Sequence, residues 1–253
     1  MNKIRIVPTV LFNDFSVVKG EKFESWRIVG NIIQIIKIYS LREVDELIFF
    51  DISASKKDKK VDFKLVDEFA DHCFMPLTVG GGISSIEDIE KLLKVGADKV
   101  AINTHAFLNP KLIKNSVSKF GSQCIVVGVD YKKNAEGKNE VYIRSGSEAT
   151  KVELFEYLKN VKSLNPGEVI LTSINHDGTM KGYDIETLVK AKEILNVPVI
   201  ASGGCGNYQH MADLLKKSSM SALSASSMYH FTEQTPLGAK KFLKENGFRV
   251  RLQ

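Results

Sequence analysis

The stretch Pro76-Leu77-Thr78-Val79-Gly80-Gly81-Gly82 returns as Pro198-Val199-Ile200-Ala201-Ser202-Gly203-Gly204, at an offset of 122 residues. The same offset relates Glu46 to Glu168, and Asn103-Thr104 to Ala225-Ser226. Each half of the chain is therefore a copy of one structural unit. Half a barrel has an open sheet edge and half a core, so we expect the two halves to close into one domain over residues 1–253.

Eight short runs rich in branched apolar residues recur along the chain. They cover residues 5–10, 46–51, 77–79, 99–102, 125–130, 169–172, 199–201 and 222–225. Several are almost continuously apolar, as in parallel strands buried on both faces. Helical periodicity lies between them over 84–93, 110–120 and 185–195, with Ser84 as a candidate cap and Pro110 in a first turn behind Asn109.

Eight strands alternating with helices in 253 residues predict an α/β fold, a (β/α)8 TIM barrel built from two half-barrel repeats. The alternative is an open doubly wound sheet. The first strand lacks the G-x-G-x-x-G turn that would favour it, and the half-chain repeat decides for the barrel.

Composition narrows the class of protein. The net charge is +5, from 35 basic and 30 acidic residues, and the basic run at 56–60 is typical of a solvated loop rather than a nucleic-acid site. Cys73, Cys124 and Cys205 form no C-x-x-C pair, which argues against disulfides and a zinc site. No apolar stretch suits a signal peptide or a membrane span. We expect a cytoplasmic protein with no metal, no nucleic-acid partner and no membrane partner.

The two glycine turns each follow a strand and precede a helix. Glycine lets the backbone approach an anion, and helix N-termini point free N–H groups at it. In barrels, phosphate usually lies beyond strands seven and eight, which here means Gly203-Gly204 and Ser226-Ser227. Symmetry adds a second site at Gly81-Gly82 and Asn103-Thr104. The pattern predicts a phosphorylated ligand with a phosphate at each end, unless the glycines only make tight turns.

Two strand ends carry unequal side chains. The run Ile6-Val7-Pro8-Thr9-Val10-Leu11 and the run Ile125-Val126-Val127-Gly128-Val129-Asp130 look like copies of one strand. The second ends in an acid and the first in leucine. If the site once held two carboxylates, one remains, and a reaction that needs both an acid and a base has lost a partner.

Longer strings identify a family. They are VVKG (17–20), VDELIFFDISAS (44–55), VGGGI (79–83), GADKVAINT (96–104), GSQ (121–123), DGTMKGYD (177–184) and ASGG (201–204). Over essentially its whole length the chain resembles the cyclase subunit of imidazole glycerol phosphate synthase. In that family a barrel receives ammonia from a glutaminase subunit docked on its bottom face. It joins the ammonia to a bis-phosphorylated ribulosyl nucleotide, closes an imidazole ring and releases an aminoimidazole nucleotide.

At the end of the barrel where the family carries out its reaction, some of the family's site residues are present in this chain and others are replaced. Asp130 matches one catalytic aspartate, while Leu11 stands where the family's C-L-D-V motif has the other. Lys19, on the long loop after the first strand, is retained as a candidate catalytic residue that could meet an anionic substrate. Asp177 and Gly178 join the phosphate-binding set. Phe15 replaces a glycine, and Asn175-His176 replaces an aspartate–arginine pair. Asp14 lies close to the missing acid, but no gap in the alignment brings it into that position.

The charged residues that surround the ammonia entrance in the family are retained in this chain. Arg5, Glu46, Lys99 and Glu168 lie at strand starts and match the family's charged ring around the ammonia entrance. Buried charges are costly unless paired, so a barrel with no use for them would replace them. Each alone could be an ordinary surface charge. Asp98 and Gln123 match positions that contact the glutaminase in the family.

Other side chains receive simpler interpretations. His72 and His105 lack an acid partner and are expected to be structural. His176 beside Asp177 is a candidate substrate contact, and Cys205 is expected to be a small turn residue rather than a reactive thiol. Phe23 and Trp26 lie on the segment after the first strand and are candidates for a flexible lid.

Two functions fit this pattern. One is a divergent relative that receives ammonia from a glutaminase and passes it to a separate amidotransferase, for amidation of a bacterial surface sugar. The other is the histidine-pathway cyclase itself with an altered site. A third, the single-chain isomerase of the same fold, needs no ammonia, so the retained ring argues against it. No cofactor is expected in any of the three.

Overall fold

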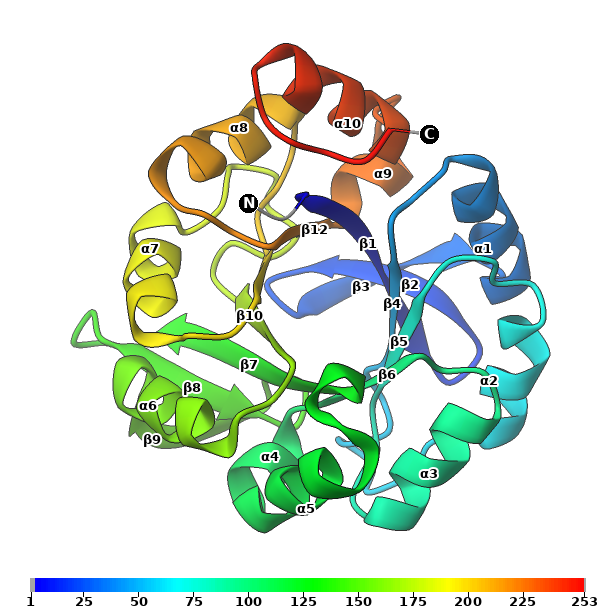
Figure 1. The fold of residues 1–253 in the computed structure, drawn as a ribbon, viewed down its shortest axis with the longest axis vertical. Coiled ribbons are helices and arrows are strands. Elements are labelled where there is room, and N and C mark those ends of the chain that lie inside the picture. The colour runs from blue at the N-terminus through cyan, green and yellow to red at the C-terminus, as the bar shows by residue number, and fades with distance from the viewer. Residues whose placement is uncertain (1–2, 253) are drawn as a thin grey trace.

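Eight parallel strands close into a barrel in the computed structural model, which describes residues 3–252 (Figure 1). The order around the barrel is β1, β4, β5, β6, β7, β10, β11 and β12, and β12 pairs again with β1. Their bounds are Arg5–Asn13, Leu47–Asp51, Leu77–Gly80, Lys99–Ile102, Ile125–Lys133, Glu168–Ser173, Val199–Ser202 and Ala222–Ala225. Every strand predicted from an apolar run is present, and the (β/α)8 barrel is confirmed.

Helices surround the barrel in a ring (Figure 1). They are α1 (Ile32–Leu41), α2 (Phe63–Ala70), α3 (Ile86–Lys94), α4 (Thr104–Leu108), α5 (Pro110–Phe120), α6 (Leu154–Leu164), α7 (Ile185–Ile194), α8 (Tyr208–Lys217), α9 (Ser227–Phe231) and α10 (Pro236–Glu245). A 3-10 turn, η1 (Ser122–Cys124), precedes β7. The short α4 and α9 follow β6 and β12, as the half-chain repeat requires.

The cap of α3 lies one residue later than predicted. Ser85, not Ser84, is the N-cap, because its hydroxyl accepts the N–H of Asp88 at 3.1 Å. The Asp88 carboxylate in turn accepts the N–H groups of Ser84 and Ser85, both at 3.0 Å. This reciprocal capping box fixes the start of the helix.

Two hairpins extend the sheet at the C-terminal ends of β1 and β7. The first is β2 (Ser16–Glu21) with β3 (Glu24–Gly30), and the second is β8 (Asn139–Ile143) with β9 (Glu148–Glu153). The segment after the first strand is therefore a β-hairpin, whereas the sequence suggested a loop. In Figure 1, β3 lies across the centre of the barrel.

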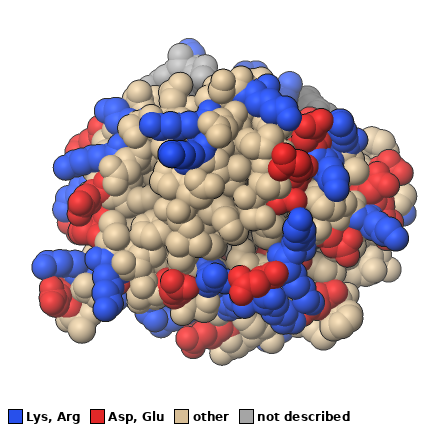
Figure 2. Space-filling model, turned by 90° about the horizontal axis from the view of Figure 1, so that it is seen from below, with Lys and Arg blue, Asp and Glu red and all other residues tan. Residues whose placement is uncertain are grey.

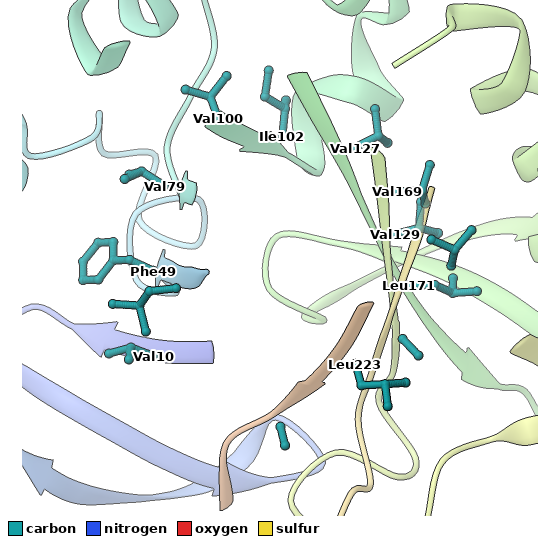
Figure 3. Close-up of a cluster of buried hydrophobic side chains, with 14 of the residues drawn as sticks. Val10, Phe49, Val79, Val100, Ile102, Val127, Val129, Val169, Leu171 and Leu223 are labelled. Atoms are coloured by element: carbon teal, nitrogen blue, oxygen red, sulfur yellow. The ribbon is translucent and has the colours of Figure 1, made fainter. Parts of the chain in front are cut away.

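The core has two parts, and the pleat of the strands separates them. Ile48 points into the barrel and Phe49 points outward to the helices, and both are almost fully buried. Figure 3 shows ten labelled outward-facing side chains, among them Val10, Val79 and Leu223, distributed around the barrel. Because both faces of each strand are buried, the strands read as continuous apolar runs.

Charged side chains of both signs lie side by side on the face seen in Figure 2, mostly near its edges. The middle of that face is largely uncharged, so this side has no broad surface of one sign. Within residues 3–252, no helix is both long enough and apolar enough to cross a membrane.

Candidate functional site

A cavity opens at the C-terminal ends of the barrel strands, beneath the β2–β3 hairpin. It is lined by all the residues that the sequence proposed for catalysis or phosphate binding: Lys19, Gly81, Gly82, Asn103, Thr104, Asp130, Asp177, Gly178, Gly203, Gly204, Ser226 and Ser227. These residues come from seven segments spread over more than 200 positions of the chain. They meet because the C-terminal ends of parallel strands converge at one end of a barrel.

Alternate side chains of β7 point into the barrel, and the carboxylate of Asp130 is the last of them at the cavity end. Its Oδ2 accepts a hydrogen bond from Asn103 Nδ2 at 3.0 Å. Burial and, to a smaller extent, the nearby negative charge of Asp177 together raise the pKa of Asp130 to about 7, against the opposing effect of the Thr172 hydroxyl. A carboxyl group with a pKa near neutrality can both donate and accept a proton, which suits general acid–base chemistry.

Leu11 lines the same cavity from β1 and is only 8% exposed. It pairs with Phe50 on β4 and Val18 on β2. Phe50, Phe23 and Trp26 also face the cavity, so this wall is apolar. Position 11 therefore contributes packing surface where Asp130 contributes a titratable group.

Asp14 does not replace the missing acid. Its carboxylate forms ion pairs with Lys57 and, at 2.9 Å, with Lys59, and it accepts a hydrogen bond from Ser53 Oγ at 3.1 Å. The hydrogen bonds from the two lysines lower its pKa to about 2. The side chain is thus held at the rim by the loop after β4, in agreement with the alignment.

Lys19 and Asp177 form an ion pair under the hairpin. The distance from Lys19 Nζ to Asp177 Oδ2 is 2.6 Å, and Lys19 is 1% exposed. At the hairpin tip the Lys22 N–H donates to the Asp177 carbonyl oxygen at 2.7 Å. A Cβ added to Gly178, whose φ is +76°, would lie 2.2 Å from the Gly20 carbonyl oxygen. The hairpin is therefore closely docked onto the turn after β10, and its Phe23 and Trp26 line the cavity.

The two glycine turns require glycine. Gly81 and Gly82 have φ values of +111° and +69°, and Gly203 and Gly204 have +93° and +102°. A Cβ on Gly81 would lie 2.3 Å from the Asp51 carbonyl oxygen, and one on Gly204 would lie 2.0 Å from that of Gly182. Tight packing thus accounts for these glycines. An anion site at the same turns is compatible with that packing and is not required by it.

The polar strand ends beside the turns have unused hydrogen-bonding capacity. Asn103 and Ser226 occupy the N-cap positions of α4 and α9, and neither side chain caps its helix. The Ser226 hydroxyl is buried, with no hydrogen-bond partner among the described residues. A buried polar atom without a partner is costly, so a bound group at this point would stabilise the site.

At the opposite end of the barrel, four charged side chains form one closed ring. Arg5 contacts Glu46 at 2.6 Å and Glu168 at 2.8 Å, and Lys99 contacts Glu46 at 2.9 Å and Glu168 at 3.3 Å. Burial disfavours the charged form of Arg5, yet Glu168 and Glu46 outweigh it and raise the pKa of the guanidinium. The four residues are thus a single ion-pair network rather than separate surface charges.

An apolar section lies between the ring and the cavity. It consists of seven side chains that are at most 4% exposed: Val7, Ile48, Ala101, Val126, Ile170, Ile200 and Ala222. Ala101 and Ile170 also line the cavity, so the floor of the cavity is the upper part of this section. Thr78, which donates to Glu46 at 2.8 Å, ties the ring to the start of β5.

Asp98 and Gln123 lie at the same end as the ring, and both are exposed. Asp98 accepts the Leu77 N–H at 2.8 Å, and Gln123 Nε2 donates to the Phe120 carbonyl oxygen at 3.3 Å. Phe74, which precedes β5, is 87% exposed. Its exposure could not be predicted from the sequence, because nothing in the pattern of residues distinguishes an exposed phenylalanine from a buried one.

Three further findings complete the site. His176 bonds to Ser173 Oγ through Nδ1 at 2.8 Å and packs behind Gly204, and it is not among the residues that line the cavity. Cys205 is 5% exposed, and burial raises the pKa of its thiol to about 12, which makes it unreactive. Asp51 lines the cavity and was missed, although an acid ending a buried strand could have drawn attention to it.

No group of three or more His, Cys, Asp or Glu side chains within residues 3–252 is arranged to hold a metal ion. Cys73, Cys124 and Cys205 are free thiols.

The fold and the site together define a (β/α)8 barrel with a polar cavity at one end and a closed charged ring at the other. The model of the histidine biosynthesis protein family matches residues 5–234. The chain is 40% identical over 251 residues to imidazole glycerol phosphate synthase subunit HisF of Streptococcus mutans, covering 99% of this chain and 100% of that protein. It is 42% identical over 250 residues to the HisF subunit of Clostridium botulinum strain 657, covering 98% of each. The chain belongs to this family, and specifically it is a HisF-like subunit.

Proposed function

We propose that this barrel accepts ammonia at its charged ring and passes it through the apolar section to the opposite end, where it serves to amidate a surface-sugar precursor. The observation that carries the proposal is the contrast between Leu11 and the ring. The acid–base pair of the cavity lacks one member, while the four charges at the other end are all present and paired.

The chemistry of position 11 supports reduced cyclase activity. A leucine transfers no proton and forms no hydrogen bond. Losing one positioned acid–base group typically lowers a rate by about 10²–10⁴. Asp14 cannot compensate, because its carboxylate is held by Lys57 and Lys59 at the rim.

The barrel interior supports ammonia transfer. Moving a charged group into an apolar section is far more costly than moving a small neutral one. The seven apolar side chains below the cavity therefore favour neutral ammonia over ammonium. Because the relatives are named as subunits of a synthase, we propose that a glutaminase partner docks at the ring end, over Asp98 and Gln123.

The acceptor reaction would take place outside this cavity. A separate amidotransferase is proposed as the partner at the C-terminal end, and the complex would act in the cytoplasm. The two glycine turns, with Asn103, Thr104, Ser226 and Ser227, would hold the ends of a phosphorylated small molecule.

The second candidate function is the cyclase reaction of histidine biosynthesis. It is favoured by Asp130, whose pKa of about 7 suits proton transfer, and by identities of 40–42% to HisF subunits over nearly the whole chain. In this case Asp130 would act as acid and base in turn, with Lys19 beside the anionic substrate.

The two functions are separated by assaying the purified barrel with ammonium chloride and the bis-phosphorylated ribulosyl nucleotide. We expect turnover at least about 10²-fold below that of the Leu11→Asp variant. Turnover by the wild-type protein equal to that of Leu11→Asp would refute the proposal and establish the cyclase. Leu11→Asn, which restores polarity without an acid, is the matched control.

The ring is tested in the whole assembly of glutaminase, barrel and amidotransferase, in which the amidated product is formed. Lys99→Ala removes one member of the ring, so product formation from glutamine should change while product formation from added ammonium stays the same. Lys190→Ala is the control, because Lys190 is an exposed lysine of α7 that pairs with Glu186 of the same helix and not with a ring residue. Equal changes with both nitrogen sources would contradict an entrance role.

A further inference from the structure

A second buried ion pair lies beside the charged ring. Lys240 Nζ is 3.1 Å from Asp45 Oδ1, and the two side chains are 2% and 3% exposed. The pair joins α10, near the end of the chain, to the segment just before β4. Neither residue lines the cavity or belongs to the ring.

Asp45 links the strand starts that carry two of the ring residues. Its Oδ2 accepts the N–H of Ile6 at 2.8 Å, and its own N–H donates to the Ile6 carbonyl oxygen at 3.3 Å. Ile6 follows Arg5, and Asp45 precedes Glu46. These two hydrogen bonds therefore fix the spacing and register of the backbone at Ile6 relative to the backbone at Asp45. The side-chain contact between Arg5 and Glu46, at 2.6 Å, lies one residue away.

Lys240 in turn fixes Asp45. Its ammonium group also donates to the Glu43 carbonyl oxygen at 2.6 Å, so it ties together two points of the segment that leads into β4. The other buried residues of α10 are Pro236, Ala239 and Leu243, which makes Lys240 a charge within an apolar stripe. Replacing a buried ion pair by apolar residues of similar volume is often neutral or stabilising, so packing alone does not explain it.

We infer that Asp45 and Lys240 are positioning residues for the ring: they hold Arg5 and Glu46 in the geometry that closes it. The inference rests on the proposed function only for the meaning of the ring as an ammonia entrance. The role of Asp45 and Lys240 in holding Arg5 and Glu46 does not depend on that function and is tested separately.

The test is the rotation rate of the Arg5 guanidinium group, measured by ¹⁵N NMR on the full-length protein. Arg5 donates through Nη1 to Glu46 and through Nη2 to Glu168, so rotation about its Nε–Cζ bond requires both contacts to break. In Lys240→Met we expect this rotation to become about tenfold faster, the change that follows from weakening one charge-assisted hydrogen bond. Arg144, a half-buried arginine that forms an ion pair with Asp58, serves as the internal reference and should not change.

Two further variants keep the test decisive. Lys192→Met removes a lysine that bonds to a backbone carbonyl, that of Val197, far from Asp45 in sequence, and should leave Arg5 unchanged. Should Lys240→Met fail to fold because Asp45 is left unpaired, the Asp45→Asn/Lys240→Met double variant buries no unpaired charge and carries the same expectation. Arg5 rotation equal to wild type in a folded Lys240 variant would overturn the inference. A failed ammonia assay with faster Arg5 rotation would instead refute the proposed function alone.

Discussion

Replacing Asp130 by asparagine should stabilise the protein, and the gain should grow with pH. Burial and the charge of Asp177 raise the pKa of this carboxyl from 3.8 to about 7. A raised carboxyl pKa means that the folded state holds the proton more tightly than the unfolded state. Below about pH 4 the carboxyl group is protonated in both the folded and the unfolded state and does not affect the free energy of unfolding. As the pH rises from about 4 through about 7, the free energy of unfolding falls.

The size of the effect follows from the shift. One pKa unit corresponds to about 1.4 kcal/mol, so the full cost above pH 7 is about 4 kcal/mol. Part of it is already present at pH 5, and about 2.5 kcal/mol is added between pH 5 and pH 8. An asparagine side chain at this position cannot ionise and avoids this cost. The stabilisation by Asp130→Asn, relative to wild type, should be about 2.5 kcal/mol larger at pH 8 than at pH 5.

The assay is urea unfolding of both proteins at pH 5 and pH 8, followed by circular dichroism. Any change in packing or in the hydrogen bond from Asn103 adds the same amount at both pH values, so the difference isolates ionisation. Asp14→Asn is the control. The pKa of Asp14 is lowered to about 2, so its contribution is present above 3.8 and lost only in strong acid. Its effect should be equal at pH 5 and pH 8, and an effect of Asp130→Asn equally independent of pH would refute the reasoning.

Three other predictions concern the scaffold of the site. Gly204→Ala should destabilise the protein by about 1–3 kcal/mol more than Gly137→Ala in thermal unfolding, because both glycines have positive φ but a Cβ meets the Gly182 carbonyl oxygen only at position 204; equal losses would show that strain rather than contact decides. Ser85→Ala should cost about 1 kcal/mol in urea unfolding through loss of the α3 cap, and an unchanged midpoint would contradict the capping box. Iodoacetamide at pH 8 should leave Cys205 unmodified in the native protein while it alkylates the half-buried Cys124, as mass spectrometry would show; rapid alkylation of Cys205 would contradict its burial and its pKa of about 12.

The barrel strands were predictable because both of their faces are buried. In the strand Lys99–Ile102, the consecutive residues Val100, Ala101 and Ile102 are buried on both faces of the sheet, so the apolar run stands out in the sequence. The hairpins were missed for the opposite reason. In β3 and β9 most side chains are exposed or half-buried, and these strands form by pairing with β2 and β8 rather than by burying an apolar face. The position of the α3 cap was wrong by one residue, because adjacent serines are indistinguishable without the geometry of Asp88.

The site was predictable wherever its residues end a strand. Asp130 and the glycine turns follow apolar runs, and parallel topology brings such ends together. Orientation was not predictable: His176 is adjacent to Asp177 in sequence, yet its ring turns back to Ser173. Contacts between distant segments were also hidden. Lys240 and Asp45 are 195 positions apart, and no local pattern relates them.

The hairpin over the cavity has a consequence for the time course of ligand binding. The hydrogen bond from Lys22 to Asp177 and the ion pair between Lys19 and Asp177 hold the hairpin tip down, so we expect a ligand long enough to reach both glycine turns to bind after the tip has lifted. Opening then precedes association and sets its upper speed. In stopped-flow experiments the observed rate constant should level off as ligand concentration increases, and the plateau should equal the opening rate of the hairpin. Once the hairpin is closed, the same contacts should also delay escape, so we expect the residence time of a ligand to depend on the hairpin as well as on the groups that hold the ligand.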